Sequence, residues 1–172
     1  MSQRALSTSP APAPWETLHS PRDLGAWLAD RFPHVDPDVG ERELADALVL
    51  RESIARLALA ASREERPATG DIDVVNLFAA TLDLPPALAG SSRQAGASRA
   101  RPTQALSTIA RDAVRMFRPD TAGRIRECSA DDCAIVYLDT SRSGNRRWCS
   151  MQRCGNRAKV RAHRSRNATR AG

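Results

Sequence analysis

The chain has 172 residues, 41% of them hydrophobic, so it can bury one core of ordinary size together with a smaller module. Its formal net charge is +6. No apolar run approaches the roughly 20 residues of a membrane span, and residues 1–14 lack the apolar core of a secretion signal. These features disfavour membrane-spanning and secreted proteins, and we expect a cytoplasmic protein with no membrane partner.

The positive charge is concentrated near the C-terminus. Residues 1–119 have a net charge of −1, whereas residues 120–172 have a net charge of +7. From Thr140 onward the chain contains ten basic residues and no acidic one. A segment of this kind favours a polyanion as partner, through phosphate contacts and the release of counterions.

The first elements can be placed from the capping residues and prolines that mark their ends. Residues 1–14, in which Pro and Ala alternate, contain too little apolar bulk to repay ordering, and we expect a disordered tail. A first helix should begin after Ser20 as N-cap, with Pro21 in its first turn, and end before Pro33. A longer helix is expected over residues 38–63, because apolar residues recur there at helical spacing.

Two further helices complete the N-terminal part. The third is expected to be capped by Asp71 or Asp73, and the fourth by Thr103. Between them, residues 87–102 are rich in Gly, Ser, Ala and Arg, which indicates a flexible connection. Residues 15–118 therefore predict a small helical bundle, in which no motif indicates a particular chemistry.

All four cysteines lie in the last 45 residues, as two pairs of equal spacing: Cys128 with Cys133, and Cys149 with Cys154. Four thiolates satisfy a tetrahedral zinc ion and leave no open position, which is typical of a structural site. Two disulfides are the alternative, but they require an oxidising compartment, and the C-x-x-C spacing of redox-active pairs is absent. We therefore predict one structural Zn2+ bound by these cysteines.

The residues around the cysteines predict a treble-clef-like finger made of a knuckle, a β-hairpin and a helix. Residues 134–140 are expected to form one strand of the hairpin and residues 147–149 the other, joined by a Ser-Gly-Asn turn. Two cysteines five residues apart differ by about 140° on a regular helix, so both can face one ion only at a helix end. With Ser150 as N-cap, we expect a helix over residues 151–164 that carries a metal ligand in its first turn.

The chain resembles a known family in three stretches of the finger. Residues 139–142 (DTSR), 146–151 (RRWCSM) and 154–159 (CGNRAK) resemble the CGNR zinc-finger signature. More diffusely, residues 15–118 resemble the helical ABATE domain that usually precedes that finger. The resemblance implies a finger over residues 124–167, zinc and nucleic-acid binding, and a role in stress-induced transcriptional regulation.

The basic residues of the finger are candidate nucleic-acid contacts. Arg153, Arg157, Arg161 and Arg164 share a narrow arc on the expected helix at 100° per residue. The alternative is that arginines neutralise the zinc centre, whose formal charge with four thiolates is −2, and for Arg157 both interpretations stay open. The full set of candidates is Arg142, Arg146, Arg147, Arg153, Arg157, Lys159, Arg161, Arg164 and Arg166.

Three further residues of the motif are expected to be structural. We expect Trp148 to form the core of the small module, the alternative being a platform on which a base stacks. Gly155 would permit a close backbone approach or an amide-to-thiolate bond, and Asn156 would tie the knuckle by side-chain hydrogen bonds.

The sequence thus predicts a mainly α regulator, and not an enzyme, whose zinc finger binds nucleic acid, DNA rather than RNA. It contains no Ser-His-Asp arrangement, no open-site metal pattern and no Gly-rich phosphate loop. The alternatives are an RNA-binding protein and a zinc-stapled module that docks an acidic partner. A homodimer and a partner in the transcription machinery are both compatible with the sequence.

Overall fold

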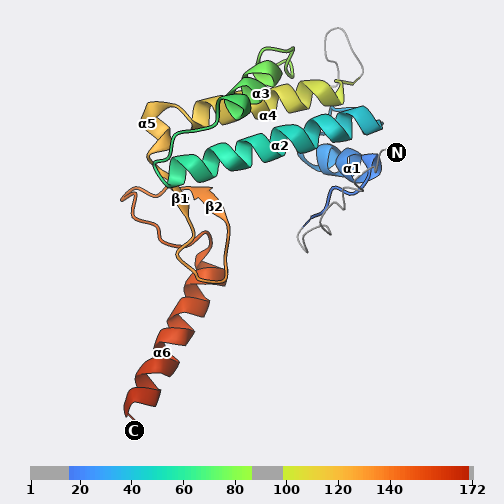
Figure 1. Cartoon of the computed structure of the whole chain (residues 1–172). Coiled ribbons are helices and arrows are strands. Elements are labelled where there is room, and N and C mark those ends of the chain that lie inside the picture. The colour runs from blue at the N-terminus through green and yellow to red at the C-terminus, as the bar shows by residue number, and fades with distance from the viewer. Residues whose placement is uncertain (1–15, 87–98, 171–172) are drawn as a thin grey trace, which may run out of the picture.

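A computed structural model describes the chain over residues 16–86 and 99–170, and its side chains as far as residue 163. The predicted tail, and residues 87–98 of the predicted connection, lie outside the described residues. The described part consists of six α-helices, one short π-helix and two short strands, so the mainly α prediction is confirmed (Figure 1). Within it, no helix has both the length and the apolar composition needed to cross a lipid bilayer.

Four helices form the N-terminal bundle: α1 (Pro21–Arg31), α2 (Glu41–Ser62), α3 (Thr69–Ala79) and α4 (Pro102–Met116). The long helix α2 contacts the other three, and α3 packs along α4 (Figure 1). Burial of their apolar stripes builds one core, and removal of this apolar surface from water is the main stabilising contribution. The largest members of that core are Leu24, Leu28, Val35, Leu44, Leu50, Leu57, Val75 and Leu106.

The bundle helices start close to their predicted caps, but only α1 starts as predicted. Ser20 Oγ accepts a hydrogen bond from the Asp23 amide at 3.3 Å, and Pro21 occupies the first turn of α1. Helix α2 begins three residues later than expected, because the Glu43 carboxylate accepts the Gly40 amide at 3.1 Å and closes the first turn there.

Helices α3 and α4 begin before the residues predicted to cap them. Neither Asp71 nor Asp73 is the N-cap of α3. The buried Asp71 carboxylate instead binds Arg56 of α2, with an Nη2 to Oδ1 distance of 2.6 Å, because a charged partner satisfies a buried carboxylate better than a backbone amide does. Helix α4 begins at Pro102 rather than after Thr103, since the fixed φ of proline suits the first helical position.

The last residues of the predicted flexible connection are held in place. Ala100 is buried, and its amide donates to the His34 carbonyl at 2.8 Å. Its own carbonyl accepts the Asp36 amide, also at 2.8 Å, so that Ala100 forms an isolated parallel bridge with Val35. The chain is therefore anchored to the bundle immediately before α4 begins.

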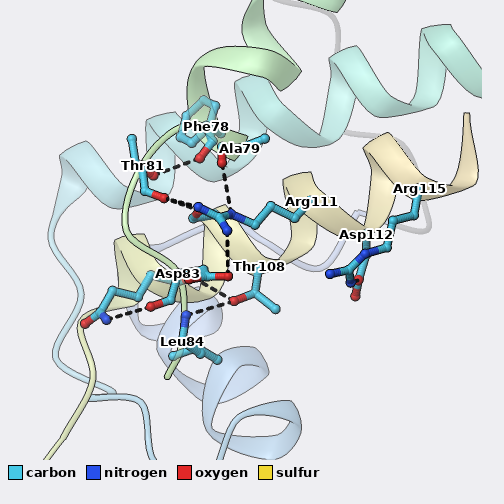
Figure 2. Close-up of polar contacts among 11 residues, drawn as sticks. Phe78, Ala79, Thr81, Asp83, Leu84, Thr108, Arg111, Asp112 and Arg115 are labelled. Atoms are coloured by element: carbon cyan, nitrogen blue, oxygen red, sulfur yellow. Dashed lines mark hydrogen bonds and ion pairs between the residues drawn. The ribbon is translucent and has the colours of Figure 1, made fainter. Parts of the chain in front are cut away.

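Hydrogen bonds fix the irregular segment that follows α3 against α4 (Figure 2). Arg111 of α4 donates to the carbonyl groups of Ala79 and Thr81, each at 2.9 Å, and forms an ion pair with Asp83 at 3.0 Å. The Leu84 amide donates to the Thr108 hydroxyl at 3.1 Å. Side chains of α4 thus satisfy backbone groups that no regular structure would pair.

The finger is attached at the C-terminal end of α2. Helix α5 (Pro119–Ala122) leads to β1 (Ile125–Glu127), which pairs in antiparallel fashion with β2 (Val136–Leu138) (Figure 1). Arg63, just after α2, forms two hydrogen bonds with Glu127, from Nε to Oε1 at 2.8 Å and from Nη2 to Oε2 at 3.1 Å. This ion pair joins the bundle to the small sheet.

The strand pairing differs from the prediction. Strand β2 lies within residues 134–140 as expected, but its partner is β1, and residues 147–149 form no strand. The Arg147 carbonyl instead accepts the Ser129 amide at 2.8 Å, so this segment lies against the knuckle, residues 128–133. Strand β1 escaped prediction because three residues, one of them apolar, are too few to show an alternating pattern.

The finger ends in a π-helical turn, η1 (Met151–Gly155), followed by α6 (Asn156–Arg170), which extends away from the bundle (Figure 1). Ser150 is the N-cap as predicted, and its hydroxyl accepts the Arg153 amide at 3.4 Å. The Gly155 amide reaches back five residues to the Ser150 carbonyl at 3.1 Å, which defines the wider turn.

Candidate metal centre

The sulfur atoms of the four cysteines all lie within 4.8 Å of one another. The Cys149 sulfur is 3.7 Å from that of Cys133 and 3.6 Å from that of Cys154. Zinc–sulfur bonds of 2.3 Å in a tetrahedron place the sulfurs about 3.8 Å apart, whereas a disulfide requires about 2.05 Å. The four thiols are thus spaced as ligands of one ion, and all four are free of disulfide bonds.

Local backbone geometry brings the two pairs together. Cys128 directly follows β1, and its amide donates to the Ile135 carbonyl at 2.9 Å, while the Cys133 amide donates to the Ala130 carbonyl at 3.0 Å and turns the knuckle. Cys149 precedes the N-cap of η1 and Cys154 lies inside it. On a regular helix, two cysteines five residues apart would point in different directions. Here Cys149 lies before the helix and Cys154 lies in its wider π turn, so both sulfurs meet at the helix end, as the sequence predicts.

The electrostatics of the cluster favour a bound cation. Burial acts to raise the pKa of the Cys128 thiol, but the amides of Cys149 and Ala130 donate to its sulfur and lower this pKa to about 7. Burial and the neighbouring sulfurs raise the pKa of Cys149 to about 12. Four sulfurs this close ionise together only when a cation offsets their charge. The donor set fits Zn2+, and the four cysteines are positioned to bind one such ion.

Trp148 packs directly against the cysteine cluster, as does Tyr137. Cys128, Ala130 and Cys154 are buried beneath them. The two aromatic rings therefore supply most of the apolar cover that a module of this size possesses.

Gly155 and Asn156 both stabilise the turn that carries Cys154. Gly155 is buried below the Met151 side chain, and a Cβ at position 155 would stand only 2.3 Å from Met151 Sδ. The Asn156 side chain donates from Nδ2 to the Gln152 carbonyl at 3.3 Å. The turn thus depends on one residue without a side chain and on one amide side chain that holds a carbonyl of η1.

Two arginines of α6 face the knuckle and pair with its acids. Arg157 Nη2 lies 3.3 Å from Cys154 Sγ, and its Nη1 lies 3.2 Å from the Asp132 carboxylate. Arg161 lies 3.0 Å from Asp132 and 3.8 Å from Asp131, and its hydrogen bond lowers the pKa of Asp132. Arg157 therefore contacts both a metal ligand and a carboxylate, whereas Arg161 contacts the two knuckle carboxylates.

Arg146 and Arg147, in the loop before η1, make different contacts. Arg146 donates from Nε to the Trp148 carbonyl at 2.8 Å and from Nη2 to the Cys149 carbonyl, and it lies over the Tyr137 ring at 4.8 Å. Arg147 stacks over the Trp148 ring at 5.0 Å and is exposed. Both residues are exposed, but Arg146 is held by two carbonyl groups and a ring, whereas Arg147 rests on the Trp148 ring.

The remaining candidate cations divide by position. Arg142, Arg153 and Lys159 are exposed on the surface of the finger. Arg164 and Arg166 lie within α6, but the structure describes side chains only as far as residue 163, so theirs are outside the described part.

Asp139 organises the loop that carries several of these cations. Its carboxylate is fully buried and accepts the amides of Ser141 and Arg146, each at 2.9 Å. Hydrogen bonds from Ser141 and from the Arg146 amide lower the pKa of Asp139 to about 2. Two sequence signals mark Asp139: it opens the DTSR stretch of the signature, and it is the last acidic residue before a long basic segment.

Two family models match the chain. The CGNR zinc finger matches residues 124–167, and ABATE, whose description is "Putative stress-induced transcription regulator", matches residues 5–120. The second match covers about two thirds of the 172 residues. None of the curated proteins matches this chain.

Proposed function

Because the chain belongs to the ABATE family and contains a CGNR zinc finger, we propose that it is a transcription regulator whose finger binds nucleic acid, DNA rather than RNA. The observation that carries the proposal is the exposed positive charge of the finger. Arg142, Arg147, Arg153 and Lys159 are exposed, and no acidic residue follows Asp139 to compensate them. Exposed guanidinium and ammonium groups of this density favour contacts with phosphates.

Some basic residues of α6 are already paired with carboxylates, and this pairing distinguishes them from the residues we expect to contact phosphate. Arg157 and Arg161 are paired with carboxylates on the knuckle side. Lys159 lies about 160° from both of them around the helix, at 100° per residue, and so faces away from the knuckle. We therefore assign phosphate contact to Lys159 on α6 and to the exposed arginines of the preceding loop and of η1.

Zinc, when bound, supplies structure rather than chemistry, because four cysteine ligands leave it no open position. The cysteines then hold the loop before η1 and the start of α6 in a fixed relation. For this reason we propose a binding protein and not an enzyme.

Salt titration of binding to a mixed-sequence DNA duplex tests the proposal. Each phosphate contact contributes about −0.9 to the slope of log K against log salt concentration, so Arg142→Ala, Arg153→Ala and Lys159→Ala should each flatten it by about 1. Arg161→Ala should change the slope less, because Asp132 already pairs with that side chain. Arg22→Ala, an exposed arginine of α1, is the matched control and should leave the slope unchanged.

Failure of the wild-type chain to bind duplex or single-stranded DNA at low salt would contradict the proposal. Displacement of bound DNA by polyglutamate as effectively as by unlabelled DNA would indicate an acidic protein partner instead. Tighter binding to an RNA of the same sequence would indicate that the finger binds RNA rather than DNA.

A further inference from the structure

An open surface cavity of about 330 Å3 lies on the finger, and none of its lining residues is a metal ligand. Its lining residues are Asn145, Arg146, Arg147, Trp148 and Met151. Its volume is within the range of about 300–1,000 Å3 that small-ligand sites occupy. The lining combines one aromatic ring, two guanidinium groups, one amide and one thioether, and this combination restricts the ligand it suits.

The floor of the cavity is an aromatic ring held in place from below. Trp148 packs against the cysteine cluster and is only partly buried. The Arg147 guanidinium already stacks over its indole at 5.0 Å, so this ring face accepts a flat group. Arg146 is fixed by the Trp148 and Cys149 carbonyls, and it therefore supplies a positive charge that does not need to be ordered on binding.

The rim carries groups suited to the edge and the face of a heterocycle. The Met151 side chain is exposed although it is large and apolar, at 49% of its full surface. Thioethers contact aromatic rings favourably and adapt to their shape. Asn145 Oδ1 accepts the Ser143 hydroxyl at 2.7 Å, which orients an amide of the kind that pairs with base edges.

We propose that this cavity binds a nucleobase that is not stacked within a duplex, either unpaired in a single strand or extruded from a helix. The base stacks on Trp148 in place of the Arg147 guanidinium, which moves to the phosphate of the same nucleotide. Asn145 hydrogen-bonds the edge of the base, and Met151 covers its outer side. The inference rests on the proposed function, and it adds that the finger recognises bases as well as phosphates.

Comparison of strands that differ only in their bases tests the inference. Fluorescence anisotropy at one salt concentration would measure binding of the zinc-loaded full chain to a DNA 12-mer and to a 12-mer of abasic residues. The two strands carry the same phosphates. Stacking of one base on an aromatic ring should make the normal strand bind about 5- to 150-fold more tightly.

Substitutions of residues at the rim of the cavity test whether the preference for the normal strand arises there. Asn145→Ala and Met151→Ala leave the charge unchanged and should reduce the preference for the normal strand, while binding to the abasic strand stays as in the wild type. Gln152→Ala is the matched control, because Gln152 is exposed beside Met151 but does not line the cavity. Zinc content, measured for each variant, shows that its metal centre is intact.

The outcomes separate the two proposals. A wild-type chain that binds neither strand nor a duplex contradicts nucleic-acid binding itself. Equal binding of the normal and abasic strands overturns the base cavity and leaves phosphate binding standing. A preference for the normal strand that Asn145→Ala and Met151→Ala do not reduce also overturns the cavity, because the bases are then recognised elsewhere.

Discussion

Arg157 lies with its Nη2 atom 3.3 Å from the sulfur of Cys154, while its Nη1 atom contacts Asp132 of the knuckle. One side chain thus connects a metal ligand on η1 to the loop that carries the first two ligands. Hydrogen bonds of this kind orient ligands and tune their basicity.

Arg157→Ala should therefore weaken zinc binding. Loss of such a partner costs about 10- to 100-fold in metal affinity. Competition with a chromophoric chelator at pH 7 measures the effect, and Arg153→Ala, which removes an exposed arginine one turn earlier, is the control. Equal affinities for the two variants would show that the contact with Cys154 does not support the metal.

Zinc removal should unfold the finger and leave the bundle folded. The two parts have separate buried clusters, one of leucines, valines and alanines and one around the cysteines. Structural zinc contributes on the order of 10 kcal/mol to small modules, far more than the few aromatic contacts of the finger supply. Amide hydrogen exchange after chelation should accelerate over residues 124–163 and remain slow in α2 and α4. Retained protection of β1 and β2 in the metal-free chain would contradict this expectation.

Glu16 should stabilise the bundle in a pH-dependent way. Its carboxylate pairs with Arg51 of α2 at 2.8 Å, and the hydrogen bond from Arg51 lowers the pKa of Glu16 from 4.5 to about 2. Because the folded-state pKa lies below the unfolded one, the stabilisation is fully present above about pH 4.5 and is lost as the pH falls towards 2.

Thermal melts of Glu16→Gln against the wild type would measure this contribution. Melts are recorded in the presence of a chelator, so that release of zinc at low pH does not contribute to the measured difference in stability. The variant should be less stable by roughly 1 kcal/mol at pH 7, and the difference should vanish towards pH 2. Glu64→Gln, in the exposed turn after α2, should show no such dependence. A difference for Glu16→Gln that persists at pH 2 would assign the effect to packing instead of charge.

The ion pair of Arg63 with Glu127 should limit opening of β1. Both side chains are roughly half exposed, at 47% and 41%, so the pair contributes no more than about 1 kcal/mol. Arg63→Ala should accordingly speed amide exchange in β1 by at most about fivefold, with zinc affinity unchanged. Arg66→Ala, an exposed arginine three residues later, is the control. Identical exchange in β1 for both variants would show that the pair does not tie the finger to the bundle.

Features of this fold that arise from neighbouring residues could be predicted from the sequence. Ser20 and Ser150 were both recognisable as N-caps, because a cap acts within three residues. The four cysteines were recognisable as one set because a tetrahedral ion requires four ligands, whatever path the chain takes between them.

Features that depend on distant partners could not be predicted in the same way. Asp71 looked like a helix cap because its partner Arg56 lies 15 residues earlier, on another helix. Arg161 looked free for phosphate because Asp132 lies 29 residues away in the knuckle. In both cases tertiary packing supplied a charged partner that a local pattern does not show.

The attachment of the small sheet to the end of α2 gives α6 the character of a lever. Its 15 residues extend about 22 Å at 1.5 Å per residue, away from the rest of the molecule (Figure 1). A tilt of about 10° at the sheet would sweep the far end of that rod through about 4 Å, a displacement comparable to the spacing between consecutive bases. Any tilt of the sheet relative to α2 would thus be magnified at the tip of α6.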